Sequence, residues 1–238
     1  MCLQPRSLVL PMLCCVLAAC VSKGPLQRTT LTPEARLQVA EAADAAGDSD
    51  LAISMYTAAV ADNPGNIGLQ LRCADALARK GRIGEARDLL ADRLRAQPGQ
   101  PDLTRAIALI DLVAGQLDQA IGGLDQVLAA NPGDTRALVD KAVALDLQGQ
   151  HAAAQSIYRG VLAGSPNDAA TRNNLALSLM LEGQARQALE TLAPMQGVDS
   201  SPQRLRINLG ILYAANGNTE RSRELLGNRV SEAELSAL

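Results

Sequence analysis

The stretch Asn131–Asn167, which reads NPGDTRALVDKAVALDLQGQHAAAQSIYRGVLAGSPN, is one complete unit of a pattern that decides the fold. Within it, Gly149 belongs to a series of six glycines, each 34 residues after the one before, as in 149 − 115 = 34. The series comprises Gly47, Gly81, Gly115, Gly149, Gly183 and Gly217. Self-similarity at a fixed period of this size is the sequence signature of a repeat array. The chain from Thr32 onward therefore reads as six units.

Small residues and prolines follow the same period as the glycines. Seven positions before the glycines stand Ala40, Ala74, Ala108, Ala142, Ala176 and Gly210. Five positions after them stand Ala52, Ala86, Ala120, Ala154, Ala188 and Ser222, and the first four units close with Pro64, Pro98, Pro132 and Pro166. Because the distance between packed helices depends on the side chains at their contact, small residues on both sides of a turn indicate closely packed helices.

The first half of each unit is expected to form an amphipathic helix. Within 135–148, Leu138, Ala142 and Leu145 recur at spacings of four and three, which is typical of one apolar stripe on a helix. We take these three residues as the packing stripe. Gly149 then supplies the left-handed backbone conformation that ends a helix without a steric penalty.

The second half of the unit predicts another helix, because residues 153–162 carry a second apolar stripe of the same period. Pro166 ends this helix, and Asp168 is placed to cap the next one. Thr32 and Pro33 give the first unit the same kind of start, with a capping hydroxyl before a proline at the first helical position. Since no hairpin can bury its stripes alone, neighbouring units must stack and share a continuous core.

The 34-residue length, the small residues, the glycine and the closing proline resemble tetratricopeptide repeats. The resemblance covers residues 33–238 and implies an all-α, right-handed superhelix (an α-solenoid) of about six helical hairpins with a short C-terminal tail. This chain departs from the family pattern in having no Trp and no Phe. In the fifth unit Ser200 stands where a proline is expected, and Pro194 falls inside the second helix. We expect that helix to be short or kinked near Pro194.

The N-terminal region predicts a lipoprotein signal peptide over residues 1–19. Arg6 precedes an apolar run of about ten residues, which is too short to span a bilayer and suits a signal-peptide core. The run ends in LAAC, which resembles the lipobox of bacterial lipoproteins, and this resemblance implies cleavage before Cys20 and its acylation. An ordinary signal peptide followed by a coincidental cysteine is the alternative.

Residues 20–32 read as the lipidated N-terminus and a flexible tether, because they contain Gly24, Pro25 and several polar residues. Val21 follows the cysteine, where an aspartate would resemble an inner-membrane retention signal. The resemblance therefore implies a protein anchored by lipid to the periplasmic face of the outer membrane.

Enzymatic, metal and nucleic-acid functions find no support in the composition. After removal of residues 1–19, the only thiol besides Cys20 is Cys73, which lies on the expected buried stripe and is predicted to act as a small apolar residue. His151 is the only histidine, so nucleophile and metal-ligand sets are incomplete. The remaining chain has a formal charge of 21 − 25 = −4 and almost no aromatic residues, which argues against nucleic-acid binding. We expect no catalytic residues, no metal and no cofactor.

The family resemblance implies that one face of each first helix lines a concave groove. In units three to six its apolar lining comprises Leu109, Leu112, Val139, Val143, Leu177, Met180, Ile207 and Ile211. Units one and two instead place there Glu41, Asp44, Arg72, Asp75 and Arg79, a mixed-charge set that is usually only solvated. An apolar lining on an accessible face indicates a protein partner, plausibly an amphipathic helix. A superhelix that closes on itself, or a C-terminal segment that fills the groove, would explain the same pattern.

Three asparagines, Asn173, Asn174 and Asn208, add a polar element to the proposed groove. Asn174 and Asn208 occupy equivalent positions in successive units. The resemblance implies contact with a ligand backbone, since asparagine at this position has that role in peptide-binding members of the family. An amide can equally bridge two repeats within the fold.

The last third of the chain resembles one particular family of lipoproteins that contain these repeats. TRNNLALSLMLEGQARQALETLAPM over 171–195, RLRINLGILYAANGNTERSRELL over 204–226 and the tail RVSEAELSAL are similar to the TadD family of Flp or Tad pilus assembly lipoproteins. This implies a pilotin, whose partner is the outer-membrane secretin or another pilus assembly component. A pilotin of type IVa pili and a repeat adaptor for peptidoglycan hydrolases are the alternatives.

Two charged residues, Asp111 and Lys141, stand at first-helix positions where the pattern calls for apolar side chains. A lone buried charge is costly, so we expect either that these two residues pair or that each reaches solvent.

The lipobox generates a test. Cys20→Ser removes the acylated thiol, and a protein that loses three acyl chains loses its stable membrane attachment. We expect uncleaved precursor or soluble periplasmic protein, measured by membrane fractionation and labelling with palmitate. Outer-membrane fractionation with retained palmitate label in the variant would rule out Cys20 as the anchor.

Overall fold

The computed structural model describes residues 31–195 and 203–227, and these form helices without any strand. The first helices of the units are α1 (Pro33–Ala45), α3 (Ile67–Arg79), α5 (Pro101–Val113), α7 (Thr135–Leu147), α9 (Ala169–Leu181) and α11 (Gln203–Ala215). The second helices are α2 (Ser49–Asp62), α4 (Ile83–Ala96), α6 (Leu117–Ala130), α8 (His151–Gly164), α10 (Ala185–Leu192) and α12 (Thr219–Leu226), and a 3-10 turn, η1 (Ala193–Met195), follows α10. The predicted all-α solenoid of six hairpins is confirmed.

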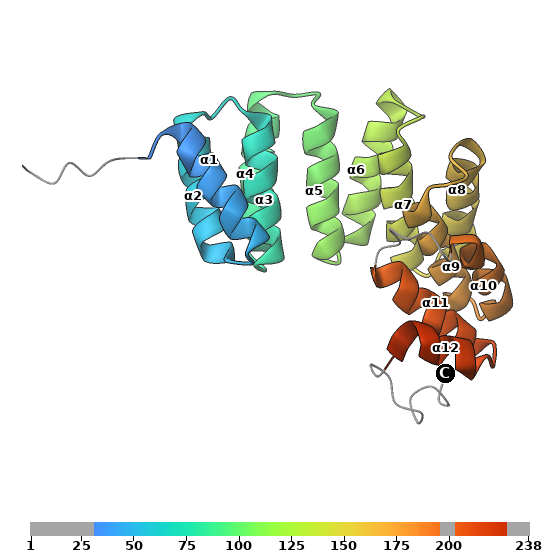
Figure 1. The fold of residues 1–238 in the computed structure, drawn as a ribbon. Helices are drawn as coiled ribbons and strands as arrows, with labels where there is room; N and C mark the ends of the chain where they lie inside the picture. Colours follow the sequence, from blue (N-terminus) through green and yellow to red (C-terminus); the bar gives the residue numbers. More distant parts are fainter. Residues whose placement is uncertain (1–30, 196–202, 228–238) are drawn as a thin grey trace, which may run out of the picture.

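The helices stack in chain order into a curved row, with the first and last units well apart (Figure 1). From α3 to α11, each first helix contacts the next first helix along the chain. No two second helices of the described chain make a contact of comparable extent. The first helices therefore line the inner side of the curve. We call this side the inner face and the opposite side the outer face.

The predicted glycine turns explain how each hairpin closes. All six glycines of the series have φ between 75° and 82°, the left-handed region that favours glycine. The predicted helix starts are also present: Thr32 accepts a hydrogen bond from the backbone N–H of Ala35 at 3.2 Å, and Asp168 accepts from Ala170 at 3.0 Å. These caps satisfy backbone groups that a helix start leaves without partners.

The small-residue series marks the contact between the two helices of a unit. Ala142 of α7 and Ala154 of α8 are both fully buried and belong to one core cluster. In the last unit Gly210 replaces the alanine, and a Cβ atom built there would lie 2.5 Å from Cγ of Leu226. An alanine at this position would require the Leu226 side chain to move, because the leucine occupies the space that the added methyl group would fill.

The packing stripe of α7 differs in part from the sequence expectation. Ala142 and Leu145 are buried as predicted, but Leu138 is only partly buried, and Ala137 and Ala144 are fully buried in addition. The difference arises because α7 is covered from two sides, by α6 before it and α8 after it. A stripe that assumes one covering neighbour is therefore too narrow.

Two other sequence predictions are confirmed. The second helix of unit five, α10, has 8 residues, whereas α8 has 14, and Pro194 lies in the 3-10 turn that follows it. Cys73 is buried beside Thr57, with 3.7 Å between Sγ and Oγ1, and burial raises the pKa of its thiol. This thiol packs as a small apolar group and is poorly suited to react.

The expected pairing of Asp111 with Lys141 is wrong. The buried carboxylate of Asp111 on α5 accepts a hydrogen bond of 2.7 Å from Nε of Arg87 on α4, and this bond raises the pKa of the arginine. Lys141 on α7 donates instead to Asp125 on α6 at 2.6 Å. Each charge therefore pairs with the preceding second helix, since that helix covers the side of the first helix on which the charge lies.

The regions outside the described residues include the signal peptide, Cys20, most of the tether and the C-terminal tail, so the predictions for them stay predictions. Over residues 31–195 and 203–227, no helix is both long enough and apolar enough to cross a bilayer.

The Arg87–Asp111 pair generates a stability prediction. Arg87→Met leaves a buried carboxylate without its partner and should lower the free energy of unfolding by about 2 kcal/mol. The positions equivalent to Asp111 in units two, four and five are Leu77, Leu145 and Leu179. The double variant Arg87→Met/Asp111→Leu should therefore return to within about 1 kcal/mol of the original chain, because a packed apolar pair can replace a buried ion pair.

Urea unfolding followed by circular dichroism measures these differences. Lys141→Met is the matched control, since its partner Asp125 is half exposed and such pairs contribute less than about 1 kcal/mol. An Arg87→Met variant as stable as the original chain would show that the Asp111 carboxylate does not need the arginine.

Candidate partner-binding groove

The eleven residues predicted to line the groove lie on four neighbouring first helices of the inner face. They come from α5 (Leu109, Leu112), α7 (Val139, Val143), α9 (Asn173, Asn174, Leu177, Met180) and α11 (Ile207, Asn208, Ile211). Every one of them is partly exposed. The structure thus brings the predicted residues together on one accessible surface, which is what a binding surface requires.

Four of the eight apolar members of this set pack against the buried core. Val139, Val143 and Met180 pack against the core cluster shared by α7 to α11, and Ile207 packs against Ala214 and Leu226. Their exposed parts are therefore held in place by buried neighbours. A partner that covers them would meet a surface that needs little reordering.

The sequence reasoning missed three side chains that extend this surface. Val113, Leu147 and Leu181 are 64%, 58% and 63% exposed, the highest values among the exposed large apolar residues of the described chain. They lie 34 residues apart and four residues after Leu109, Val143 and Leu177, hence one helical turn further along α5, α7 and α9. Their common place in the 34-residue series could have identified them. We call these six residues the apolar track.

A hollow between α3 and α5 extends the groove into unit two. It has a volume of about 420 Å³ and is lined by Leu71, Ala74, Asp75, Ala78, Leu90, Asp102, Arg105, Ala106, Leu109, Ile110, Val113 and Arg136. Alanines at positions 74, 78 and 106 leave this space, because larger side chains there would fill the gap between the helices. The sequence pattern indicates a charged face in unit two and does not predict the hollow.

The mixed-charge set of units one and two is paired within the protein. Arg79 donates to Asp44 at 2.6 Å and to Asp75 at 3.1 Å, and the hydrogen bond to Asp44 raises the pKa of Arg79. Arg72 pairs with Glu41. The bonds to Asp44 and Glu41 link α3 to α1, whereas Asp75 lies on α3 itself. The charges stabilise the stack modestly, because they are exposed, and they offer a partner little unpaired charge.

Two of the three asparagines bridge repeats. Nδ2 of Asn208 donates to Oδ1 of Asn173 at 2.7 Å, across 35 residues. Arg105 and Asp140 form the same bridge two units earlier, also across 35 residues and at 2.6 Å. At the junction between these two bridges, the equivalent positions hold Val139 and Asn174. The valine side chain cannot form a hydrogen bond with the asparagine amide.

Asn174 is consequently the asparagine whose amide has no hydrogen-bond partner among the described residues. Its side chain is partly exposed, so the amide is accessible to solvent. A ligand that reaches this amide would find both its donor and its acceptor available.

A polar cluster lies next to the groove where unit four meets unit five. Oδ1 of Asp146 accepts a hydrogen bond of 2.6 Å from Ser178 Oγ and lies 2.9 Å from Nδ1 of His151. Burial, and then the nearby Asp146 carboxylate, raise the pKa of Tyr158. The cluster links α7, α8 and α9 and has a structural role, because its serine bonds the carboxylate rather than the histidine that would activate it.

A metal site is absent from the part of the chain that the structure describes, since no three His, Cys, Asp or Glu side chains are grouped there in a way that could hold an ion.

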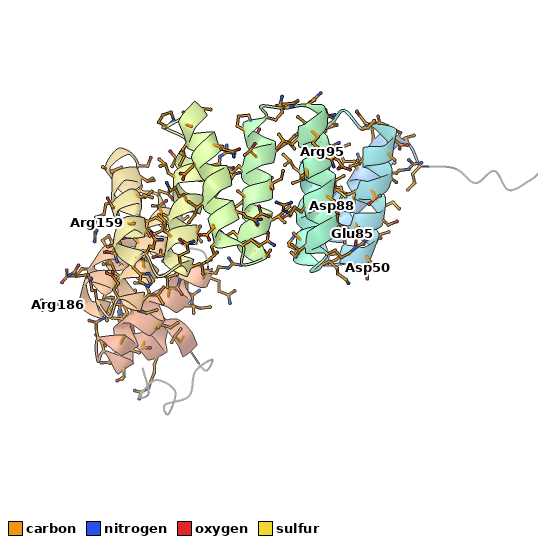
Figure 2. All side chains as sticks on the ribbon, turned by 180° about the vertical axis from the view of Figure 1, so that it is seen from behind. Asp50, Glu85, Asp88, Arg95, Arg159 and Arg186 are labelled. Carbon is orange, nitrogen blue, oxygen red and sulfur yellow. The ribbon has the colours of Figure 1, made fainter. Side chains whose placement is uncertain are left out.

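The outer face carries charged side chains. Figure 2, the view from behind, labels six of them, all on second helices: Asp50, Glu85, Asp88, Arg95, Arg159 and Arg186. The inner face of α5, α7, α9 and α11 is thus distinguished by its apolar character.

Comparison with known protein families gives tetratricopeptide repeat models over most of the array. One such model matches residues 43–110 and 147–203, a second matches 105–169 and a third matches 203–228. The first alone covers more than half of the chain.

Individual relatives match shorter parts or share the fold alone. Over 72 residues (30% of this chain and 6% of the relative), the chain is 42% identical to cellulose synthase operon protein C of Pseudomonas fluorescens. Over 70 residues (29% and 38%), it is 39% identical to uncharacterized protein y4yS of Sinorhizobium fredii, so it spans well under half of either relative. The crystal structure of PilW, described as a widely conserved type IV pilus biogenesis factor, covers 87% of this chain and 98% of its own, with 20% identity and a TM-score of 0.68.

Proposed function

Because this chain belongs to the tetratricopeptide repeat family, we propose that it is a non-enzymatic adaptor that holds a helix of a pilus secretin against its inner face. In this proposal it acts as a lipid-anchored pilotin in the assembly of a Flp or Tad pilus. The partner helix lies over α5, α7, α9 and α11, and the lipid carries the complex to the outer membrane.

The observation that carries the proposal is the apolar surface of the inner face. Eight predicted lining residues are partly exposed there, and the apolar track adds three strongly exposed side chains. Contiguous exposed apolar surface with a polar surround is typical of protein interaction sites. Its position on the inner side of a curved array favours a narrow ligand that the array can partly surround.

An amphipathic helix matches this surface better than a globular domain. Such a helix buries one apolar stripe in a hydrophobic groove and keeps its polar side toward solvent. The partner's polar side would then face the paired charges of units one and two or open water. A secretin segment of this kind also gives the lipid anchor a purpose, since secretins reside in the outer membrane.

The pilus assignment rests on sequence resemblance and on one fold comparison. The stretches 171–195 and 204–226 resemble the TadD family, and LAAC at Cys20 resembles a lipobox. The likeness to PilW supports a second candidate, a pilotin of type IVa pili, because the two chains match over nearly their whole lengths. An adaptor for peptidoglycan hydrolases uses the same fold, but no feature of the groove favours it.

Leu177→Glu tests the groove. Leu177 is partly exposed at the centre of the lining, while Leu175, Ala176 and Leu179 beside it are buried and keep α9 packed. A charge at a central apolar anchor should cost about 2 kcal/mol or more, which is over tenfold in affinity for the secretin segment. In cells we expect unassembled secretin away from the outer membrane and no surface pili, measured by fractionation, immunoblotting and electron microscopy.

Leu51→Glu is the matched control. Leu51 is exposed at the start of α2, outside the groove, so the same substitution there should leave secretin assembly unchanged. The lipoprotein level and helicity of both variants should equal those of the original chain. A folded, correctly localised Leu177→Glu protein that still assembles the secretin would place the binding site outside the groove.

A further inference from the structure

The hollow between α3 and α5 reaches from the inner face down to the core. Its floor includes Ala74, Leu90 and Ile110, which are at most 5% exposed and belong to the core cluster of units one to three. Its volume is about 420 Å³, whereas an apolar cavity of about 150 Å³ already holds a benzene molecule. The hollow therefore has room for a ring and for alkyl groups beside it.

Two alanines distinguish this junction from the other junctions between units. Ala78 of α3 and Ala106 of α5 both line the hollow. At the other four junctions the equivalent pairs consist of longer side chains: Asp44 and Arg72, Leu112 and Asp140, Asp146 and Asn174, and Met180 and Asn208. The hollow thus lies at the one junction where both positions are small.

The charges that line the hollow balance each other. They are Asp75, Asp102, Arg105 and Arg136, so the formal charge is 2 − 2 = 0, and all four residues are at least partly exposed. The charged groups therefore lie toward the mouth, above a buried apolar floor. An uncharged occupant complements this arrangement. An aromatic ring gains further attraction, because guanidinium groups bind to the face of a ring.

The chain cannot supply such a ring itself. It has no Trp and no Phe, and its only aromatic residues are three tyrosines, all within the described helices. Tyr56 and Tyr158 are buried, and Tyr213 packs against the core shared by α7 to α11. The tether, the C-terminal tail and a second copy of the chain therefore have no Trp or Phe to offer. An aromatic occupant must belong to another protein.

We infer that the hollow receives one large aromatic side chain, Trp or Phe, of the partner helix. Leu109 and Val113 line the hollow and are also members of the apolar track, so a helix lying on the track passes the mouth. A ring that enters displaces water from a mostly apolar space and gains affinity with the area that it buries. The inference rests on the proposed function, since it names the side chain that anchors the partner in the same groove.

An aromatic anchor sets the register of the partner helix. Apolar side chains of similar size can slide along the track, because each can take the place of the next. A ring in the α3–α5 hollow cannot shift to the next junction, where Leu112 and Asp140 replace the two alanines. Buried aromatic residues of this kind are typical hot spots of protein interfaces. The partner helix should therefore carry its Trp or Phe at the end that lies over units two and three.

Three blocked amino acids test the inference on the full chain in detergent: N-acetyl-tryptophanamide, N-acetyl-phenylalaninamide and N-acetyl-leucinamide. Binding is followed by NMR of the methyl groups of Ala78 and Ala106 in the isotope-labelled protein. Because the chain has no Trp, the fluorescence of the tryptophan probe gives a second measurement. We expect saturable shifts with the aromatic probes and about fivefold weaker binding of the leucine probe, which buries less area and has no ring.

Variants locate the binding. Ala78→Leu introduces the residue that unit three has at the equivalent position, Leu112, so α3 should tolerate it while the hollow is filled. The aromatic probes should then produce no saturable shift of the Ala106 methyl group. Ala106→Asn, the residue that units five and six have there, fills the hollow from α5 and should have the same effect. Ala42→Leu, at an exposed position of α1 outside the hollow, is the matched control and should change nothing.

Several results would overturn the inference. These are equal binding of the leucine probe, unchanged aromatic binding in an Ala78→Leu protein that circular dichroism shows to be folded, and the absence of a saturable shift at either methyl group. Nuclear Overhauser contacts from these methyl groups to residues 228–238 in the free protein would assign the hollow to the chain's own tail. Concentration-dependent shifts without any probe would assign it to a second copy.

The proposed function fails independently of the hollow, because Leu177 on α9 does not line it. Loss of secretin assembly in Leu177→Glu together with no aromatic binding would remove the anchor and leave the groove. Aromatic binding in the hollow together with normal secretin assembly in Leu177→Glu would support the anchor and reject the groove over α9.

Discussion

The close approach of the two helices in each hairpin is the constraint on which the rest of the array depends. It requires small residues at two positions, such as the fully buried Ala142 and Ala154, and a left-handed glycine between the helices. Once these are repeated every 34 residues, the hairpins are alike and can stack only in one way. The inner face follows directly, because stacking aligns equivalent positions of successive first helices and turns a sequence period into a continuous surface.

Much of the helical array could be predicted from the sequence, because helix periodicity, turn glycines and helix caps are local features. The short α10 followed from Pro194 in the same way. The partners of Asp111 and Lys141 could not be predicted, since they depend on which side of a first helix the preceding second helix covers. The residues proposed to line the groove share positions in the repeat, so the sequence places them on one side of the array. The hollow between α3 and α5 depends on side-chain sizes in several helices at once.

Charged side chains are distributed unevenly along the inner face. Units one and two use their charges to bond neighbouring helices, as Arg79 and Arg72 of α3 do with Asp44 and Glu41 of α1. Units three to six carry mostly apolar side chains at the equivalent positions, but Asp140 and Asp146 of unit four also bond neighbouring helices, through Arg105 and Ser178. Units three to six therefore combine an apolar lining with polar bonds between helices, whereas units one and two carry paired charges at the equivalent positions.

The reduced length of α10 has a mechanical consequence. In a solenoid each unit contacts only its neighbours. The stiffness of the array between two adjacent units therefore depends on how extensively those units contact each other. α10 has 8 residues where α2, α4, α6 and α8 have 14, so the joint between units five and six is the most compliant one. Under tension along the array the last unit would swing or detach first, while units one to four moved as one stiff rod.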